Sequence, residues 1–234
     1  EAKNVLPRDD GAYGPMLGLS AITGVLPARV LGMGSSRSTA GIYGIFAGTA
    51  SHLYQLQGDG SWLQVSKSGG YTLDPGNGDR PRGVQYGDRY ISAMGISNPV
   101  QSFNVAGGSQ FADLAATAPR ALHIAVVREF IVLGNTWDPS QLVRPDQLWW
   151  SAFGNAASWP APGSPSAQAV QSDRQILADG GHLQGIAAGI GGADAAIFGE
   201  TRIWRMAYEG PPTVYRFDAV ERARGCYASG SSGT

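Results

Sequence analysis

Four short apolar runs, each ending in glycine, recur along the chain. They are Ile45–Gly48, Ile91–Gly95, Ile131–Gly134 and Ala196–Gly199. Each is too short for an ordinary helix and is bounded by turn residues, a pattern that favours buried strands. The closing glycines follow one another at intervals of 47, 39 and 65 residues. The pattern therefore predicts a β-unit that is repeated along the chain.

Each glycine-terminated run is followed by a turn and an aromatic run, and three of them are preceded by an apolar partner. The aromatic runs are Leu53–Leu56, Val100–Phe103, Leu148–Phe153 and Ile203–Tyr208. The preceding partners are Val84–Tyr86, Ile124–Val127 and Leu183–Ala188. Two short runs joined by a few turn residues predict a hairpin, and the aromatic run extends it into a meander.

Antiparallel units of three or four strands, recurring about every 40 to 50 residues, are typical of β-propeller blades. We therefore predict an all-β fold, a partial β-propeller of three- to four-stranded blades, with about four blades in residues 41–234. The long third interval holds two polar, proline-rich stretches, Asp138–Pro145 and Ser158–Gln171, which we expect at blade edges or faces. A β-sandwich with uneven loops is the alternative.

Residues 1–40 show neither helical nor strand periodicity, and we predict an extended lead-in or docking segment there. Leu6, Tyr13 and Leu17 are its candidate anchors, and Ala28–Leu31 is a candidate short strand. The stretch Gly32–Ser36 has the composition of a loop. Four blades are fewer than most closed propellers use. We therefore predict an incomplete ring, in which the remaining part is missing or is supplied by another segment. Glu1 stands in place of an initiator Met, which predicts that the chain was either processed or is part of a longer product.

The composition and the net charge disfavour several structural and functional classes. The 234 residues include 34 glycines and 14 prolines, which disfavours long helices. Lysine and arginine total 17 against 18 aspartates and glutamates, for a net charge of -1. Proteins that grip DNA usually carry a basic excess, so this chain is expected neither to bind DNA tightly nor to bind an acidic membrane, although it could surround DNA. A single cysteine, Cys226, excludes an intrachain disulfide.

Residues that could support catalysis are sparse. His52, His123 and His182 lack metal-site spacing, and neither a nucleophile elbow nor a phosphate-binding loop occurs. A propeller glycosidase would need paired carboxylates, for which the candidates are Asp113, Asp173, Asp179 and Glu200. Sialidase-type Ser-x-Asp-x-Gly-x-x-Trp turns are absent from the sequence. We expect no catalytic residue, metal or cofactor, and hence no enzyme.

Aromatic and arginine residues are the candidates for an interface. Trp149 and Trp150 must point to opposite faces of one strand, one toward a core and the other toward a neighbour. Lys3 and Lys67 are the only lysines among 17 basic residues, and arginine suits polar interfaces. Packing between blades and genomic base composition are the alternative explanations. The candidate interface residues are Tyr13, Arg80, Arg82, Trp137, Trp149, Trp150, Trp159, Arg202 and Arg205.

Short fragments from residue 4 to about residue 225 form an ordered series. They are Asn4–Pro7, Tyr13–Pro15, Phe46–Ala50, Leu53–Tyr54, Val65–Ser66, Gly69–Tyr71, Gln85–Asp88, Ala118–Pro119, Phe130–Asn135, Trp150–Ser151, Asn155, Trp159, Asp179–Gly181, Phe198–Glu200, Ile203–Met206, Tyr208, Gly210–Pro212 and Phe217–Asp218. Each fragment is degenerate, and their order is the specific part. The series resembles the N-terminal half of the tail hub, or nozzle, proteins of short-tailed double-stranded DNA bacteriophages.

The resemblance implies a structural virion protein that contains a β-propeller and has no catalytic residues. Such subunits are assembled in the host cytoplasm into a homo-oligomeric, commonly sixfold ring below the portal and adaptor proteins. The ring lines the DNA ejection channel and anchors tail fibres or spikes, while double-stranded DNA passes without specific binding and no membrane is a partner. A net charge near zero suits a DNA channel, because basic residues that neutralise phosphates would bind the DNA and slow its passage. A propeller that binds a carbohydrate or a protein is the alternative.

Overall fold

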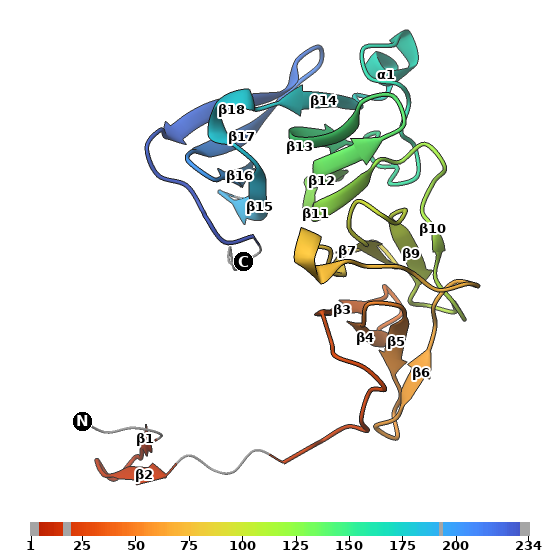
Figure 1. Cartoon of the computed structure of the whole chain (residues 1–234), viewed down its shortest axis with the longest axis vertical. Coiled ribbons are helices and arrows are strands. Elements are labelled where there is room, and N and C mark those ends of the chain that lie inside the picture. The colour runs from red at the N-terminus through yellow and green to blue at the C-terminus, as the bar shows by residue number, and fades with distance from the viewer. Residues whose placement is uncertain (1–4, 16–19, 192–193, 230–234) are drawn as a thin grey trace.

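The computed structural model describes residues 5–15, 20–191 and 194–229. Its strands form four four-stranded antiparallel sheets and one two-stranded sheet. Each larger sheet is a simple meander whose strands follow chain order, and Figure 1 shows the four sheets side by side along an open arc. The fold is all-β, a partial β-propeller, as the recurring apolar runs predict. Successive sheets pack in series, which replaces the two-sheet sandwich considered as the alternative.

The four sheets are numbered here as blades 1 to 4 in chain order. Blade 1 comprises β3 (Gly32–Arg37), β4 (Tyr43–Gly48), β5 (Leu53–Leu56) and β6 (Trp62–Gln64). Blade 2 comprises β7 (Arg82–Tyr86), β8 (Arg89–Ala93), β9 (Gln101–Asn104) and β10 (Ala112–Asp113). Blade 3 comprises β11 (Arg120–Val127), β12 (Phe130–Asp138), β13 (Leu142–Trp150) and β14 (Asp173–Ile176). Blade 4 comprises β15 (Leu183–Ile190), β16 (Asp194–Gly199), β17 (Ile203–Gly210) and β18 (Val214–Glu221).

The glycine-terminated runs are the second strands of the blades, and the aromatic runs are the third strands. Both strand positions lie inside a sheet, and in the two central blades their side chains are covered by a neighbouring blade on each face. In β12, for example, Ile131 packs in the core shared with blade 2 and Val132 in the core shared with blade 4. Side chains of adjacent residues leave a strand on opposite faces, so a continuous apolar run serves two cores.

Three hydrophobic cores join the blades in sequence. Phe46 and Phe103 belong to the core between blades 1 and 2. Ile91 and Leu133 belong to the core between blades 2 and 3, and Ile197 belongs to the core between blades 3 and 4. The arc is therefore stabilised by burial between neighbours, which is the usual arrangement in repeat architectures.

The first strands of the blades, β3, β7, β11 and β15, contact one another in succession along the inner side of the arc. Two glycines permit the close approach of β3 to blade 2. A Cβ atom at Gly34 would lie 2.2 Å from the Tyr90 hydroxyl oxygen, and one at Gly32 would lie 2.0 Å from the Pro81 carbonyl oxygen. Glycine is needed at both positions because any side chain would overlap these atoms.

These close contacts explain the main error of the sequence interpretation. Gly32–Ser36 was interpreted as a loop, whereas Gly32–Arg37 is the strand β3 and pairs with β4 along its whole length. Blade 1 therefore begins at Gly32, so the predicted boundary at residue 41 is wrong. The candidate strand Ala28–Leu31 is wrong as well, since the strand starts immediately after it.

The two predicted insertions of blade 3 differ from each other. Asp138–Pro145 mainly lengthens the β12–β13 hairpin, in which Trp137 pairs with Val143. Ser158–Gln171 is a loop that contains the short helix α1 (Pro165–Ala169). Ser164 caps this helix by accepting a hydrogen bond from the Ala167 amide at 3.2 Å. The 3-10 helix η1 (Pro75–Asn77) lies in the segment between blades 1 and 2.

The lead-in forms a small hairpin rather than a wholly extended segment. β1 (Val5–Pro7) pairs with β2 (Tyr13–Pro15), and in Figure 1 this hairpin lies apart from the blades. Leu6 and Tyr13 are exposed, so neither is anchored within the described part of the chain, and Leu17 lies outside the described residues. Nearer blade 1, the Trp62 indole Nε1 donates to the Gly24 carbonyl at 3.1 Å.

Candidate interface and axial pocket

Three of the four tryptophans predicted at an interface are buried within the chain. Trp149 lies in the core between blades 2 and 3, and Trp159 packs in the same core. Trp150 lies in the core between blades 3 and 4. The opposite orientation of Trp149 and Trp150 is confirmed, but both serve cores of the same chain. These three residues are consequently removed from the candidate interface, and packing between blades accounts for them.

Trp137 remains accessible, on the outer part of blade 3. The Arg120 guanidinium carbon lies 4.2 Å from the centre of its ring, a cation–π arrangement. Trp137 and Arg120 line a pocket of about 260 Å³ together with Asp113 and Pro139. Arg120 Nη1 also donates to the Ser97 carbonyl at 3.2 Å, which fixes the guanidinium across blades 2 and 3.

Arg202 and Arg205, the candidates on blade 4, form ion pairs at the surface. Arg202 Nη1 lies 3.2 Å from Asp179 Oδ2. The Arg205 guanidinium pairs with Asp194, to which its Nε donates at 2.8 Å. Tyr13 is exposed on β2. The structure therefore leaves these residues available to a partner but does not bring them together.

The remaining arginine candidates, Arg80 and Arg82, line a pocket on the inner side of the arc. Its volume is about 460 Å³, and residues from β3, β7, β11 and β15 surround it, so all four blades contribute. We call it the axial pocket. Sequence analysis selected the two arginines but could not find the pocket, because its walls come from four strands far apart along the chain.

Arg82, the first residue of β7, is held by neutral acceptors. Its Nη1 atom lies 2.7 Å from the Leu122 carbonyl oxygen and 2.8 Å from His123 Nδ1, and its Nη2 atom lies 3.3 Å from Ser229 Oγ. Since the guanidinium can only donate, His123 Nδ1 is an acceptor and Nε2 carries the proton. That Nε2 donates to the Leu183 carbonyl at 2.9 Å. Burial, and then the Arg82 charge, lower the pKa of His123 to about 3.

The neutral, buried His123 predicts a marked pH dependence of stability. The unfolded chain binds a proton at this residue below about pH 6.5, whereas the folded chain does so only near its lowered pKa of about 3. The stabilisation is therefore complete above pH 6.5 and is lost as the pH falls toward 3, by about 1.4 kcal/mol per pH unit.

Urea unfolding at pH 7 and pH 5 measures this effect. Between these values the wild-type chain should lose about 2 kcal/mol more unfolding free energy than His123→Gln, which has no proton to gain. Because the test compares how much each protein's unfolding free energy changes between the two pH values, a general destabilisation of the variant does not affect it. Equal pH dependence in the two proteins would contradict the assignment of a neutral imidazole.

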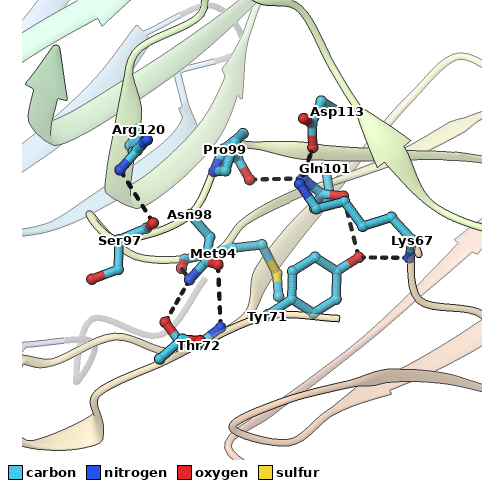
Figure 2. Close-up of polar contacts among 10 residues, drawn as sticks. All are labelled: Lys67, Tyr71, Thr72, Met94, Ser97, Asn98, Pro99, Gln101, Asp113 and Arg120. Carbon is cyan, nitrogen blue, oxygen red and sulfur yellow. Dashed lines mark hydrogen bonds and ion pairs between the residues drawn. The ribbon is translucent and has the colours of Figure 1, made fainter. Parts of the chain in front are cut away.

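A second polar cluster joins blade 2 to the segment that follows β6 (Figure 2). At its centre lies Gln101, which is fully buried. Its Nε2 donates to Asp113 Oδ1 at 2.6 Å and to the Pro99 carbonyl at 2.9 Å, and its Oε1 accepts from the Tyr71 hydroxyl at 3.2 Å. Burial raises the pKa of Tyr71 to about 12, so the phenol remains a donor at neutral pH. Lys67 Nζ pairs with Asp113 at 2.6 Å.

Gln101→Leu is expected to lower the unfolding free energy by about 2–3 kcal/mol, because it leaves the Tyr71 hydroxyl and the Pro99 carbonyl without their buried partner. Lys67→Met serves as the matched control, since it removes the ion pair of the same cluster from its exposed side. That change should cost less than about 1 kcal/mol. Urea titrations of the three proteins measure both effects. A loss for Gln101→Leu no larger than that for Lys67→Met would refute the central role of Gln101.

The four candidate carboxylates of a glycosidase occupy separate places. Asp113 pairs with Lys67, and Asp179 pairs with Arg202. Glu200 lies 3.7 Å from His182 Nδ1 and accepts from Gln184 Nε2 at 3.2 Å, while Asp173 accepts from the Arg174 amide at 2.9 Å. Within the described residues, no group of three or more histidine, cysteine, aspartate or glutamate side chains is placed to hold a metal ion.

Comparisons with known proteins identify no family for this chain. No protein-family model and no curated protein matches the sequence. Among solved structures, one described as the crystal structure of BBS1N in complex with ARL6DN, soaked with lead, is similar at 9% identity with a TM-score of 0.43. The alignment covers 81% of this chain and 53% of that one, so this chain spans about half the length of its structural neighbour. Across the residues that the structure describes, no helix has the length and apolar character needed to cross a membrane.

Proposed function

We propose that this chain is a structural virion protein, a tail hub or nozzle subunit of a short-tailed bacteriophage. In this proposal the subunits form a homo-oligomeric, sixfold ring below the portal and adaptor proteins. The ring lines the DNA ejection channel and anchors tail fibres or spikes. The ordered sequence fragments motivate the family. The structural observation that supports assembly is that the first and last described blades present two unlike faces, which no other blade of the described residues covers.

The outer face of blade 1 carries several exposed apolar side chains. Met33, Tyr43 and Ile45 are exposed, and the strand register places them together, with Met33 opposite Ala47, Ser35 opposite Ile45 and Arg37 opposite Tyr43. On the other face of the same sheet, Phe46 packs against blade 2. Contiguous exposed apolar side chains mark interaction surfaces.

The outer face of blade 4 is charged. Met206 of β17 points into the core, so its neighbour Arg205 points outward and pairs there with Asp194. On β18, Arg216 lies 2.8 Å from Asp218 and 2.5 Å from Glu209. Because the two outer faces differ in chemistry, a contact that joins them between successive subunits would be heterologous, and repeated heterologous contacts generate a ring when the rotation between subunits closes.

Native mass spectrometry and negative-stain microscopy of the chain, expressed with portal and adaptor proteins, test the proposal. We expect a ring that repeats this subunit around a central channel. The double variant Met33→Glu with Tyr43→Glu should abolish the ring. Leu142→Glu, at an exposed apolar position on the hairpin of blade 3, should leave it intact. A monomer that forms no ring with portal or adaptor proteins would refute the proposal.

The accessible Trp137 supports one alternative, a propeller that binds a carbohydrate or a protein. An aromatic ring beside a pocket that also holds Arg120 and Asp113 can stack on a sugar and offer hydrogen bonds to its hydroxyl groups. A glycan array would detect such binding, and Trp137→Ala should eliminate any signal found. Binding that survives this change, or an array without signals, would remove the carbohydrate alternative.

A further inference from the structure

The axial pocket holds two arginines whose charge is not balanced by a carboxylate. Arg80 and Arg82 are separated only by Pro81, and both line the pocket. Across residues 5–15, 20–191 and 194–229, neither forms an ion pair. The pocket therefore concentrates positive charge in a chain whose net charge is -1.

Arg82 is half-buried, and the acceptors around it are all neutral. They are the Leu122 carbonyl, the His123 imidazole and the Ser229 hydroxyl. Burial, and then the charge of Arg80, lower the pKa of Arg82, but a guanidinium keeps its proton at neutral pH. A charge withdrawn from water without an opposite charge is unfavourable. An anion in the pocket would supply the missing counter-charge for Arg82, and the exposed Arg80 beside it offers a second positive charge to the same anion.

The other walls of the pocket indicate what the anion is attached to. Leu31, Met33, Ile124 and Ile186 contribute apolar surface. His123 also lines the pocket, but it is neutral and adds no charge. A volume of about 460 Å³ falls in the range of about 300–1,000 Å³ found for small-molecule sites. The space is larger than an isolated phosphate or acetate ion needs.

We propose that the axial pocket is a binding site for a small organic anion. Its oxyanion group, a phosphate or a carboxylate, is held by Arg80 and Arg82, whose planar guanidinium groups match the geometry of both. Its apolar part lies against Ile124 and Ile186. Every wall of the site belongs to one chain, and binding is measured without a ring, so failure of this proposal is distinguishable from failure of the proposed tail function. Met33 is shared by the pocket and the outer face of blade 1 and is therefore left unchanged in the binding tests.

Isothermal titration calorimetry of the full chain with four probes tests the proposal. Inorganic phosphate and acetate measure the oxyanion group alone, whereas propylphosphonate and butyrate add an apolar tail. We expect saturable binding of one molecule per chain, with the better tailed probe binding at least about tenfold more tightly than its tail-free counterpart. Comparison of phosphate and propylphosphonate with acetate and butyrate identifies which oxyanion group the pocket prefers. Absence of saturable binding with all four probes, or equal affinity with and without the tail, would overturn the proposal.

Three substitutions that each remove one positive charge locate the site. Arg80→Gln should weaken binding of the better probe by about tenfold or more, and the fold should tolerate it because Arg80 is exposed. Arg82→Gln should weaken binding at least as much, with thermal unfolding as the check that this variant is folded. Arg222→Gln, an exposed change at the end of β18, is the matched control and should bind like the wild type. Equal losses in Arg80→Gln and Arg222→Gln would show non-specific attraction and refute the site.

Discussion

Phe46→Ala is expected to lower the unfolding free energy by about 3–5 kcal/mol, the usual cost of removing a buried aromatic side chain. Phe46 is only 1% exposed and lies at the centre of an aromatic cluster. Its ring stacks on Tyr90 with centroids 4.6 Å apart and meets Phe103 and Phe111 edge-on at 5.1 and 5.5 Å. Because these partners belong to blade 2 or to the loop before β10, the cavity would open between two blades.

The position of Phe46 at one end of the arc also predicts which blade opens first in the Phe46→Ala variant. Blade 1 has a blade neighbour on only one side, so its attachment depends on this single core. Hydrogen exchange should accelerate first in β3–β6 of Phe46→Ala, while β11–β13 keep their protection. Tyr43→Ala, on the same strand but on the exposed face, is the control and should cost less than about 1 kcal/mol. Similar losses for the two variants, or uniform acceleration of exchange, would contradict this account.

The sequence predicts best the strands that have a blade on each side. Phe130–Gly134 is apolar throughout because its alternating side chains enter two cores, and such a run stands out in any sequence. The strand β3 is different, since Gly32 and Gly34 are required by the close approach of Pro81 and Tyr90. Glycine and serine are typical of loops. The local sequence therefore did not show that β3 is a strand whose glycines are required by contacts with blade 2.

The same reasoning explains the outcome at the candidate sites. From the sequence alone, a tryptophan in a β-rich chain can belong to a core or to a surface. The structure places Trp149 and Trp159 in the core between blades 2 and 3. Arg80 and Arg82 were predicted only as surface or interface candidates, and their setting depends on His123 of β11 and Ser229 near the end of the described chain. Such long-range proximity is set by the arrangement of blades and cannot be derived from spacing.

Trp150→Ala is expected to cost a further 3–5 kcal/mol, about as much as Phe46→Ala, but through a different part of the arc. The Trp150 indole is buried between blades 3 and 4, where its ring meets Tyr215 edge-on with centroids 5.2 Å apart. It also fixes the insertion of blade 3, since its Nε1 donates to the Gln171 carbonyl at 2.9 Å. One substitution therefore removes both the packing of blade 4 and the anchor of the α1 loop.

Two companion variants separate these contributions. Trp150→Phe keeps an aromatic ring in the core but leaves the Gln171 carbonyl without its donor, so it should cost about 1–3 kcal/mol and increase proteolysis within residues 158–171. Trp137→Ala removes a tryptophan from the accessible side of the same blade and should cost clearly less than Trp150→Ala, because less apolar surface is uncovered. Urea unfolding and limited proteolysis measure both effects. If Trp137→Ala proved as destabilising as Trp150→Ala, burial between blades could not be the main source of stability in this fold.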